Sequence, residues 1–236
     1  VSSGFGQSNI PRPNTGFVSV AAGGSHALAL RQDGSIVAWG DNDSGQCNIP
    51  SPNAGFVAIA AGGWHSLGLK ADGSIIVWGS NNQSQAPLQG GDYVAVSAYS
   101  YSLVLRSDGS LVGWGTDGEN TVAPPPAGND FVGISTGDLF GLALKRDRSL
   151  AGWGSNGRGQ ATPPAGNDFI AMSAGEWHSL ALRADGSIVG WGDNGEGQAA
   201  PPEGKDYVAV AAGYQHSLAL KSDGSIVGWG NNWYGQ

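Results

Sequence analysis

The sequence predicts an all-β protein, a β-propeller built from six copies of one short repeat. The pattern Ile/Leu-x-x-Trp-Gly occurs six times along the 236 residues. Its tryptophans are 36 to 39 residues apart, and a period of about 38 residues is typical of repeat arrays. No window combines helical spacing of apolar residues with a helix cap. The tryptophans are Trp39, Trp78, Trp114, Trp153, Trp191 and Trp229.

The last complete repeat shows the three strands that we expect in every copy. Residues 207–212 and 216–221 each alternate between larger apolar and small side chains, which is the periodicity of a strand. Between the second and third strands lies Ser-Asp-Gly-Ser, in which Gly224 supplies the positive φ of a tight hairpin turn. Residues 226–230 form the third strand. The repeats are expected to begin near residues 17, 56, 93, 131, 169 and 207.

Alternation of large and small side chains suits sheets that are covered on both faces. Paired leucines such as Leu218 and Leu220 face one way, and small residues fill the positions between them. Neighbouring propeller blades require this pattern, because no blade buries both of its faces alone. We therefore expect a single domain over residues 1–236, with six blades favoured. A seven-bladed ring and a fragment of a longer array are the alternatives.

The two ends of the chain carry matching residues. Gly6-Gln7 corresponds to Gly235-Gln236, and residues 8–13 resemble the continuation that follows the first repeat at residues 47–50. We expect the N-terminal segment, residues 1–16, to supply the outer edge of the last blade and to close the ring. Closure would leave no open sheet edge. The chain has no initiator Met and no signal peptide, so we expect a mature or excised product.

The amino-acid composition limits the classes of partner that the protein could bind. The net charge is −8, from 11 basic and 19 acidic residues, and this argues against a nucleic-acid-binding surface. No apolar run is long enough to insert into a membrane. Cys47 is the only cysteine, so the chain contains no internal disulfide.

Three recurrent runs resemble those of a known family. They are Ala-Ala-Gly-x-x-His-Ser-Leu-Ala-Leu, Asp-Gly-Ser-Ile-Val-x-Trp-Gly and Asn-x-x-Gly-Gln, and they look like the regulator of chromosome condensation repeat. The short repeat is similar to bacterial members, among them a β-lactamase inhibitory protein with three-stranded blades. The resemblance covers nearly the whole chain and implies the propeller fold. It also favours a secreted or cell-surface bacterial protein, although known relatives are mostly seven-bladed and this chain has six repeats.

Strand directions place two loops of every repeat at one end of its sheet. The inner loop joins the first and second strands, the outer loop follows the third strand, and the Asp-Gly turns lie at the other end. The loops vary among repeats, whereas the turns hardly change. Trp and Tyr on loops are residue types that dominate binding hot spots. We expect the partner-binding residues to be Trp64, Tyr99, Asp138, Glu176, Trp177, Tyr214, Trp233 and Tyr234.

All four histidines occupy one repeat position, at the start of the second strand. Equivalent positions in separate blades are held apart, so these side chains are not expected to converge on a metal ion. We expect His26, His65, His178 and His216 to be buried or half-buried and to make structural hydrogen bonds. We expect neither a metal nor a cofactor.

The function expected is that of a non-enzymatic recognition propeller, monomeric, which binds a protein partner through its loop end. Acidic loop residues favour a partner with a basic or amide-rich surface. β-Lactamase inhibition is the sharpest form that the resemblance implies. A glycan ligand, and an engineered or truncated scaffold without a selected ligand, are alternatives. An enzyme that uses carboxylates near the central channel, such as Asp138 and Glu176, ranks below these, because the spacing does not place two acids at a reacting distance.

Overall fold

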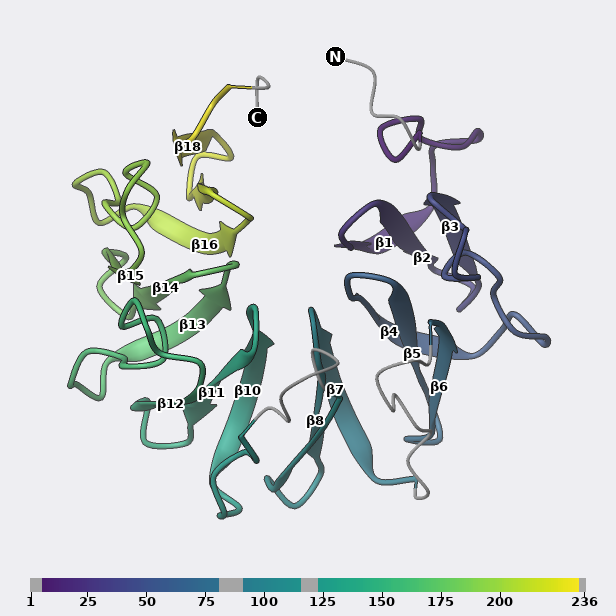
Figure 1. Cartoon of the computed structure of the whole chain (residues 1–236), viewed down its shortest axis with the longest axis horizontal. Helices are drawn as coiled ribbons and strands as arrows, with labels where there is room; N and C mark the ends of the chain where they lie inside the picture. The colour runs from purple at the N-terminus through teal and green to yellow at the C-terminus, as the bar shows by residue number, and fades with distance from the viewer. Residues whose placement is uncertain (1–5, 81–90, 116–122, 234–236) are drawn as a thin grey trace. The chain divides into compact units, whose positions relative to one another are not determined.

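The computed structural model describes residues 6–80, 91–115 and 123–233. These residues form eighteen strands and no helix, arranged as six three-stranded antiparallel sheets (Figure 1). Each sheet uses three consecutive strands, so each repeat is one blade, and we number the blades one to six in chain order. The predicted all-β fold with six repeats is confirmed. The described chain contains no helix that is long and apolar enough to cross a membrane.

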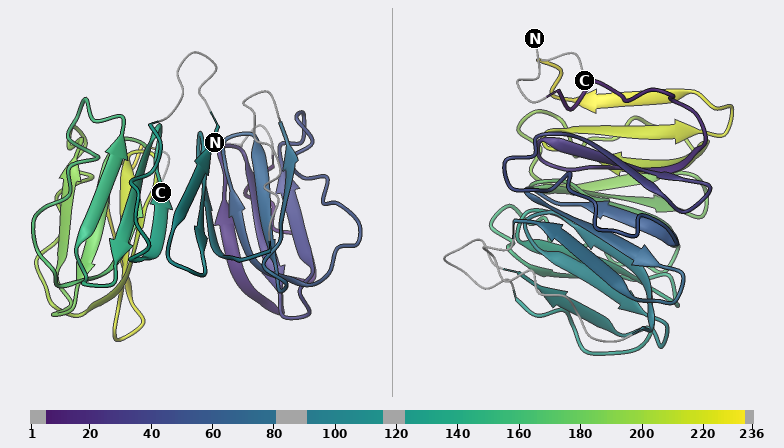
Figure 2. Two further views of the ribbon diagram at one scale, coloured as in Figure 1. Left: turned by 90° about the horizontal axis from the view of Figure 1, so that it is seen from below. Right: turned by 90° about the vertical axis from the view of Figure 1, so that its right-hand side faces the viewer.

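The strand bounds agree closely with the repeat pattern. Blades one to three are β1 (Phe17–Ala22), β2 (His26–Arg31) and β3 (Ile36–Gly40); β4 (Phe56–Ala61), β5 (His65–Lys70) and β6 (Ile75–Gly79); and β7 (Tyr93–Ala98), β8 (Ser102–Arg106) and β9 (Leu111–Trp114). Blades four to six are β10 (Phe131–Thr136), β11 (Phe140–Lys145) and β12 (Leu150–Gly154); β13 (Phe169–Ala174), β14 (His178–Arg183) and β15 (Ile188–Gly192); and β16 (Tyr207–Ala212), β17 (His216–Lys221) and β18 (Ile226–Gly230). Within a blade the strands lie side by side (Figure 2).

The chain divides into two compact units, which are described separately. The first comprises Val1–Ser107 and Val112–Thr121, and the second comprises Asp108–Leu111 and Val122–Gln236. Blades one and two thus lie wholly in the first unit, and blades four to six lie in the second.

The first strand of each blade contains a bulge that the alternating sequence pattern did not predict. In every blade the register with the second strand shifts after the first residue of the first strand. The extra residue is unpaired, and its side chain turns outward. All six bulged residues are exposed β-branched aliphatics: Val18, Val57, Val94, Val132, Ile170 and Val208.

An aromatic ring at the start of each first strand is covered by a base at the end of the second strand. In the second blade Phe56 is buried in a cluster with Leu28 and Leu30 of the preceding blade, and the Lys70 ammonium lies 3.7 Å from its ring centroid. The other five blades repeat this cation–π contact at 5.0 to 5.7 Å. The bases before the hairpin turns therefore cover the ends of the blade cores.

Neighbouring blades are joined by a chain of buried hydrogen bonds that we call the blade clasp. In the second unit, the His178 Nε2 of blade five lies 2.9 Å from the Ser217 Oγ of blade six. Ser217 donates its only hydroxyl proton to the Gln198 carbonyl at 2.9 Å. His178 must therefore donate from Nε2, which assigns its neutral tautomer. The Trp229 indole donates to the same Gln198 carbonyl at 2.9 Å.

The clasp recurs between blades one and two. His26 lies 2.8 Å from Ser66, and both Ser66 and Trp78 donate to the Gln46 carbonyl. His65 pairs with Ser102 in the same way at 2.8 Å. The predicted structural role of the histidines is thus confirmed for His26, His65 and His178, which are fully buried, while His216 is half-buried.

Closure of the ring by the N-terminal segment stays a prediction, as does the single domain over residues 1–236. The part of this segment that the structure describes contacts the first blade, where the Trp39 indole donates to the Gln7 carbonyl at 2.8 Å. Ile10 is 54% exposed. By contrast Ile49, at the same place in the next repeat, packs against the cluster around Leu28.

Replacing Ile10 by Ser tests closure. If Ile10 packs between the last and first blades, its loss should lower stability by about 1.5–3 kcal/mol, the value of a buried aliphatic side chain. Ile49→Ser should cost a similar amount and serves as the positive control, with both melting temperatures measured by circular dichroism. An Ile10→Ser variant that melts like the wild type would contradict closure.

The buried histidines predict loss of stability in mild acid. Burial lowers the pKa of His65 and of His178 to about 4. The charge of His26 lowers the pKa of His65 further, and the charge of His216 lowers the pKa of His178 further. Below pH 6.5 these histidines bind protons in the unfolded chain but remain neutral in the folded chain. The contribution of these histidines to stability is therefore full above pH 6.5 and falls as the pH drops toward 4, by about 1.4 kcal/mol per pH unit for each histidine.

The His178→Phe variant measures the contribution of His178 to this pH dependence of stability. Phenylalanine suits the position, because blade four already carries Phe140 there. Urea unfolding between pH 7.5 and pH 5 should show a shallower decline in the variant, by about 1.4 kcal/mol per pH unit. An unchanged slope would show that His178 does not resist protonation.

Candidate functional site

The two variable loops of each blade lie at the same end of the sheet, as the strand directions predicted. The last residue of the inner loop accepts a backbone hydrogen bond from the first residue of the outer loop in the five blades whose outer loop begins among the described residues. In blade five, for example, Asp193 N donates to Trp177 O at 2.8 Å. The Asp-Gly turns consequently occupy the opposite end.

Inner loops of neighbouring blades in the second unit are bonded to one another. Asp138 N donates to Glu176 O at 3.2 Å, and Glu176 N donates to Gly213 O at 3.3 Å. A Cβ on Gly175 would lie 2.4 Å from the Gly213 oxygen, so glycine is required for this approach. The side chains of Asp138, Glu176 and Tyr214 therefore come from the same position of three successive loops.

Aromatic rings and charged groups meet on these loops. The rings of Trp177 and Tyr214 lie 6.2 Å apart at 46°. The Arg158 guanidinium lies 4.5 Å from the Trp177 ring centroid and forms an ion pair with Asp193 at 2.6 Å. We call the group of Asp138, Arg158, Glu176, Trp177, Asp193 and Tyr214 the loop site.

Glu176 is the most unusual member of the loop site. Only 7% of the residue is exposed, and its Oε2 has no hydrogen-bond partner among the described residues. The Tyr214 hydroxyl lies near the carboxyl group. Burial raises the pKa of Glu176 to about 7; the Tyr214 hydroxyl and Arg158 oppose this effect, and the charges of Asp138 and Asp193 add to it. The Glu176 charge in turn is the main cause that raises the pKa of Tyr214.

The structure brings together four of the eight residues predicted to bind a partner. These are Asp138, Glu176, Trp177 and Tyr214. Trp64 and Tyr99 form a separate pair in the first unit, on inner loops joined by a 3.0 Å bond from Gly63 N to Tyr99 O. Trp233 is 80% exposed on the last outer loop, and Tyr234 lies outside the described residues.

Sequence reasoning did not include Arg158 and Asp193 in the site. Arg158 belongs to the outer loop of blade four and Asp193 to that of blade five, so their contact crosses a repeat boundary. The one available signal was that Arg158 is a basic residue among acidic loop residues.

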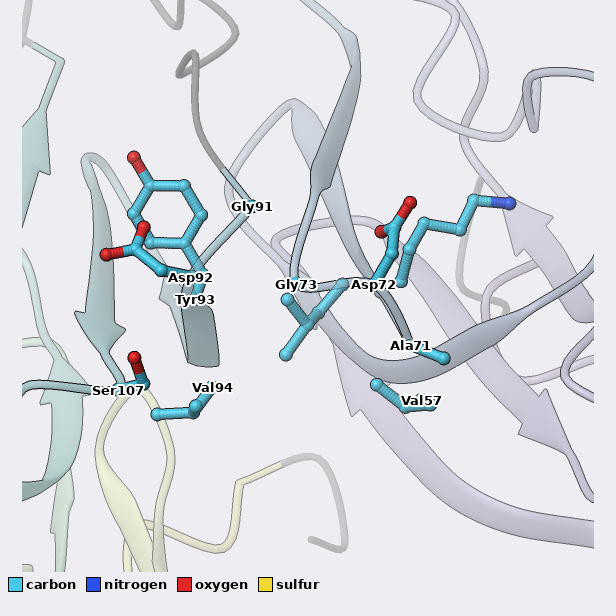
Figure 3. Close-up of a pocket in the computed structure, with 11 residues that line it drawn as sticks. Val57, Ala71, Asp72, Gly73, Gly91, Asp92, Tyr93, Val94 and Ser107 are labelled. Carbon is cyan, nitrogen blue, oxygen red and sulfur yellow. The ribbon is translucent and has the colours of Figure 1, made fainter.

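A hollow with a volume of about 480 Å³ lies at the turn end of blades two and three. Figure 3 shows the bulged Val57 and Val94 on its wall, with the Tyr93 ring pointing away from both. Its charged groups already have partners: Lys70 donates to the Ala54 carbonyl, Asp72 accepts from Ser74, and Asp92 pairs with Arg106. This hollow therefore offers a ligand fewer unpaired polar groups than the loop site does.

Metal-ligating residues do not gather in the described part of the chain. No group of three His, Cys, Asp or Glu side chains there could hold a metal ion.

Glu176→Gln should make the protein more stable at alkaline pH. Folded Glu176 holds its proton up to about pH 7, whereas the unfolded residue loses it near 4.5. The contribution of Glu176 to stability therefore declines as the pH rises between these values, by about 1.4 kcal/mol per pH unit, and glutamine removes that decline. Urea unfolding should show a larger gain for Glu176→Gln at pH 8 than at pH 5. The exposed Glu196→Gln is the control, and an equal gain at both pH values would contradict the prediction.

Comparison with known proteins supports the fold. No curated protein sequence matches the chain. The crystal structure of yeast RCC1 (Prp20) bound to Kap60 is 22% identical, with a TM-score of 0.79 over 94% of this chain and 71% of that one. Prp20p from Saccharomyces cerevisiae, in a structure described with its binding properties to Gsp1p and histones, is 21% identical, with a TM-score of 0.78 over 93% and 73% of the two chains.

A plant relative has the same fold. The ectodomain of the Physcomitrella patens receptor kinase CR4 is 23% identical, with a TM-score of 0.76 over 91% of this chain and 63% of that one. The family model described as Regulator of chromosome condensation (RCC1) repeat matches residues 17–46, 56–85, 131–160, 169–198 and 207–236. Because these segments make up more than half of the sequence, the chain belongs to the RCC1 repeat family.

Proposed function

We propose that this protein is a non-enzymatic binding module and that the loop site contacts a protein partner. The observation that carries the proposal is the pair of rings, Trp177 and Tyr214, held beside the buried carboxyl of Glu176 on loops that no core requires to be aromatic. Tyr214 is 56% exposed. Exposed aromatic side chains contribute a large contact area at low entropic cost, which suits them to binding hot spots.

The charges at the loop site indicate the kind of partner. Three acidic side chains, Asp138, Glu176 and Asp193, surround one base, and the whole chain carries a net charge of −8. Such a surface attracts a partner with basic groups and accelerates association at low ionic strength. Trp64 and Trp233, which are both exposed, are proposed as further anchors.

A comparison with known proteins also bears on the choice of function. Prp20p, the relative described above, is recorded with protein partners, which supports a protein partner for this chain as well. The sequence resemblance makes a β-lactamase one specific candidate.

A panel of purified β-lactamases, other secreted proteins and arrayed glycans would test this proposal by biolayer interferometry. For a protein that binds, Trp177→Ala and Tyr214→Ala should each weaken affinity by about 2 kcal/mol or more, which is about 30-fold, because buried aromatic anchors dominate interfaces. The melting temperature should change little.

Val208→Ala is the matched control, because Val208 is an exposed apolar residue of the same unit on the bulged first strand. If Val208→Ala or a substitution in the Asp185 turn abolished binding while Trp177→Ala did not, the loop site would be the wrong surface. Binding only to glycans would replace the protein partner by a sugar ligand.

A further inference from the structure

Glu176 presents a buried acceptor that its own chain leaves unsatisfied. The residue is 7% exposed, Tyr214 occupies one side of the carboxyl, and Oε2 has no partner within the described residues. Buried polar atoms in folded proteins nearly always have a hydrogen-bond partner, and an unpaired acceptor costs free energy. A donor from outside the chain would relieve this cost.

The charged groups that face Glu176 favour a cationic donor over a neutral one. Asp138 from the neighbouring inner loop and Asp193 from the outer loop are both negative. Arg158 is the base nearby, but its guanidinium is held by Asp193 at 2.6 Å and by the Trp177 ring. An added cation would thus meet more negative than positive charge.

The surface beside Glu176 suits a basic side chain. The half-exposed Tyr214 ring stands next to the carboxyl, and a cation above an aromatic ring is stabilised by the π electrons. This chain already places a Lys or Arg over an aromatic ring in all six blades and a guanidinium over Trp177. The same chemistry is available at Tyr214.

We propose that Glu176 Oε2, the Asp138 carboxylate and the Tyr214 ring form a subsite for one basic side chain of the partner. The inference rests on the proposed protein-binding function and names the group that the loop site recognises. The Tyr214 side chain moves aside to admit the lysine ammonium or arginine guanidinium, which then donates to Oε2. Binding ionises Glu176 and releases its proton.

Short capped peptides provide a direct test with the intact protein. An acetyl-Gly-Arg-Gly-amide peptide, its lysine counterpart and the neutral citrulline counterpart are titrated while the indole and ring signals are followed by NMR. Either basic peptide should shift the Trp177 indole and Tyr214 ring signals, and the citrulline peptide should not. Affinity should be about tenfold higher at pH 8 than at pH 6, since Glu176 must be ionised in the complex.

Variants decide whether Glu176 is responsible. Glu176→Gln should weaken peptide binding at pH 8 by about tenfold and abolish its pH dependence, because glutamine keeps the shape and removes the charge. Asp138→Asn should weaken binding as well, whereas Glu196→Gln, an exposed acid on an outer loop of the same unit, should not. Thermal unfolding confirms that each variant is folded.

Several results would overturn the subsite. They are equal binding of the citrulline peptide, wild-type affinity in Glu176→Gln, a pH dependence that survives this substitution, or no signal change with either basic peptide. Failure of the subsite is distinguishable from failure of the proposed function. If Trp177→Ala abolishes binding of a protein partner and Glu176→Gln does not, the loop site binds that partner without this contact.

Discussion

Three blade boundaries depend on one backbone carbonyl of an outer loop, that of Gln46, Gln160 or Gln198. This oxygen accepts both a tryptophan indole and a serine hydroxyl from the following blade. The glutamine side chain is buried, and its Oε1 accepts the backbone N–H two residues earlier, which fixes the loop. Because this buried carbonyl accepts two hydrogen bonds, its burial at the blade boundary costs little free energy. The apolar faces of neighbouring blades can therefore pack together without leaving polar atoms of the connecting loop unpaired.

This arrangement separates the contacts that hold the loops together from the side chains that vary among repeats. Hydrogen bonds between inner loops use backbone atoms, as in the bond from Asp138 N to Glu176 O. The glycine before each of these residues allows the loops to approach, and the next side chain is then free to differ. Asp138, Glu176 and Tyr214 occupy equivalent places, yet they present an acid, a buried acid and a phenol. The side-chain chemistry of these loops can thus change by substitution at these positions while the clasp remains intact.

The fold could be predicted from the sequence because its signals are local and repeated. The expected third strand at residues 226–230 is β18, and every first strand begins at the expected aromatic residue. The bulges were not predictable, because Val208 fits a regular alternation as well as it fits a bulge. The Arg158–Asp193 pair was missed because it joins different repeats. Glu176 lies near Tyr214, which is 38 residues later in the chain, and no local pattern encodes such a contact.

The blade clasp also bears on how such a chain can change in length. At the boundaries between blades one and two and between blades five and six, the clasp is made by two consecutive repeats. The first repeat supplies the histidine and the glutamine carbonyl, and the second supplies the serine and the tryptophan. Recombination between two repeats of a gene would therefore create a new blade boundary whose two sides can form the same hydrogen bonds. Ala27 and Gly141, which stand at the serine position in the first and fourth repeats, show that a boundary does not need the hydroxyl in every copy. Arrays with more or fewer blades are accordingly within reach of a single genetic event.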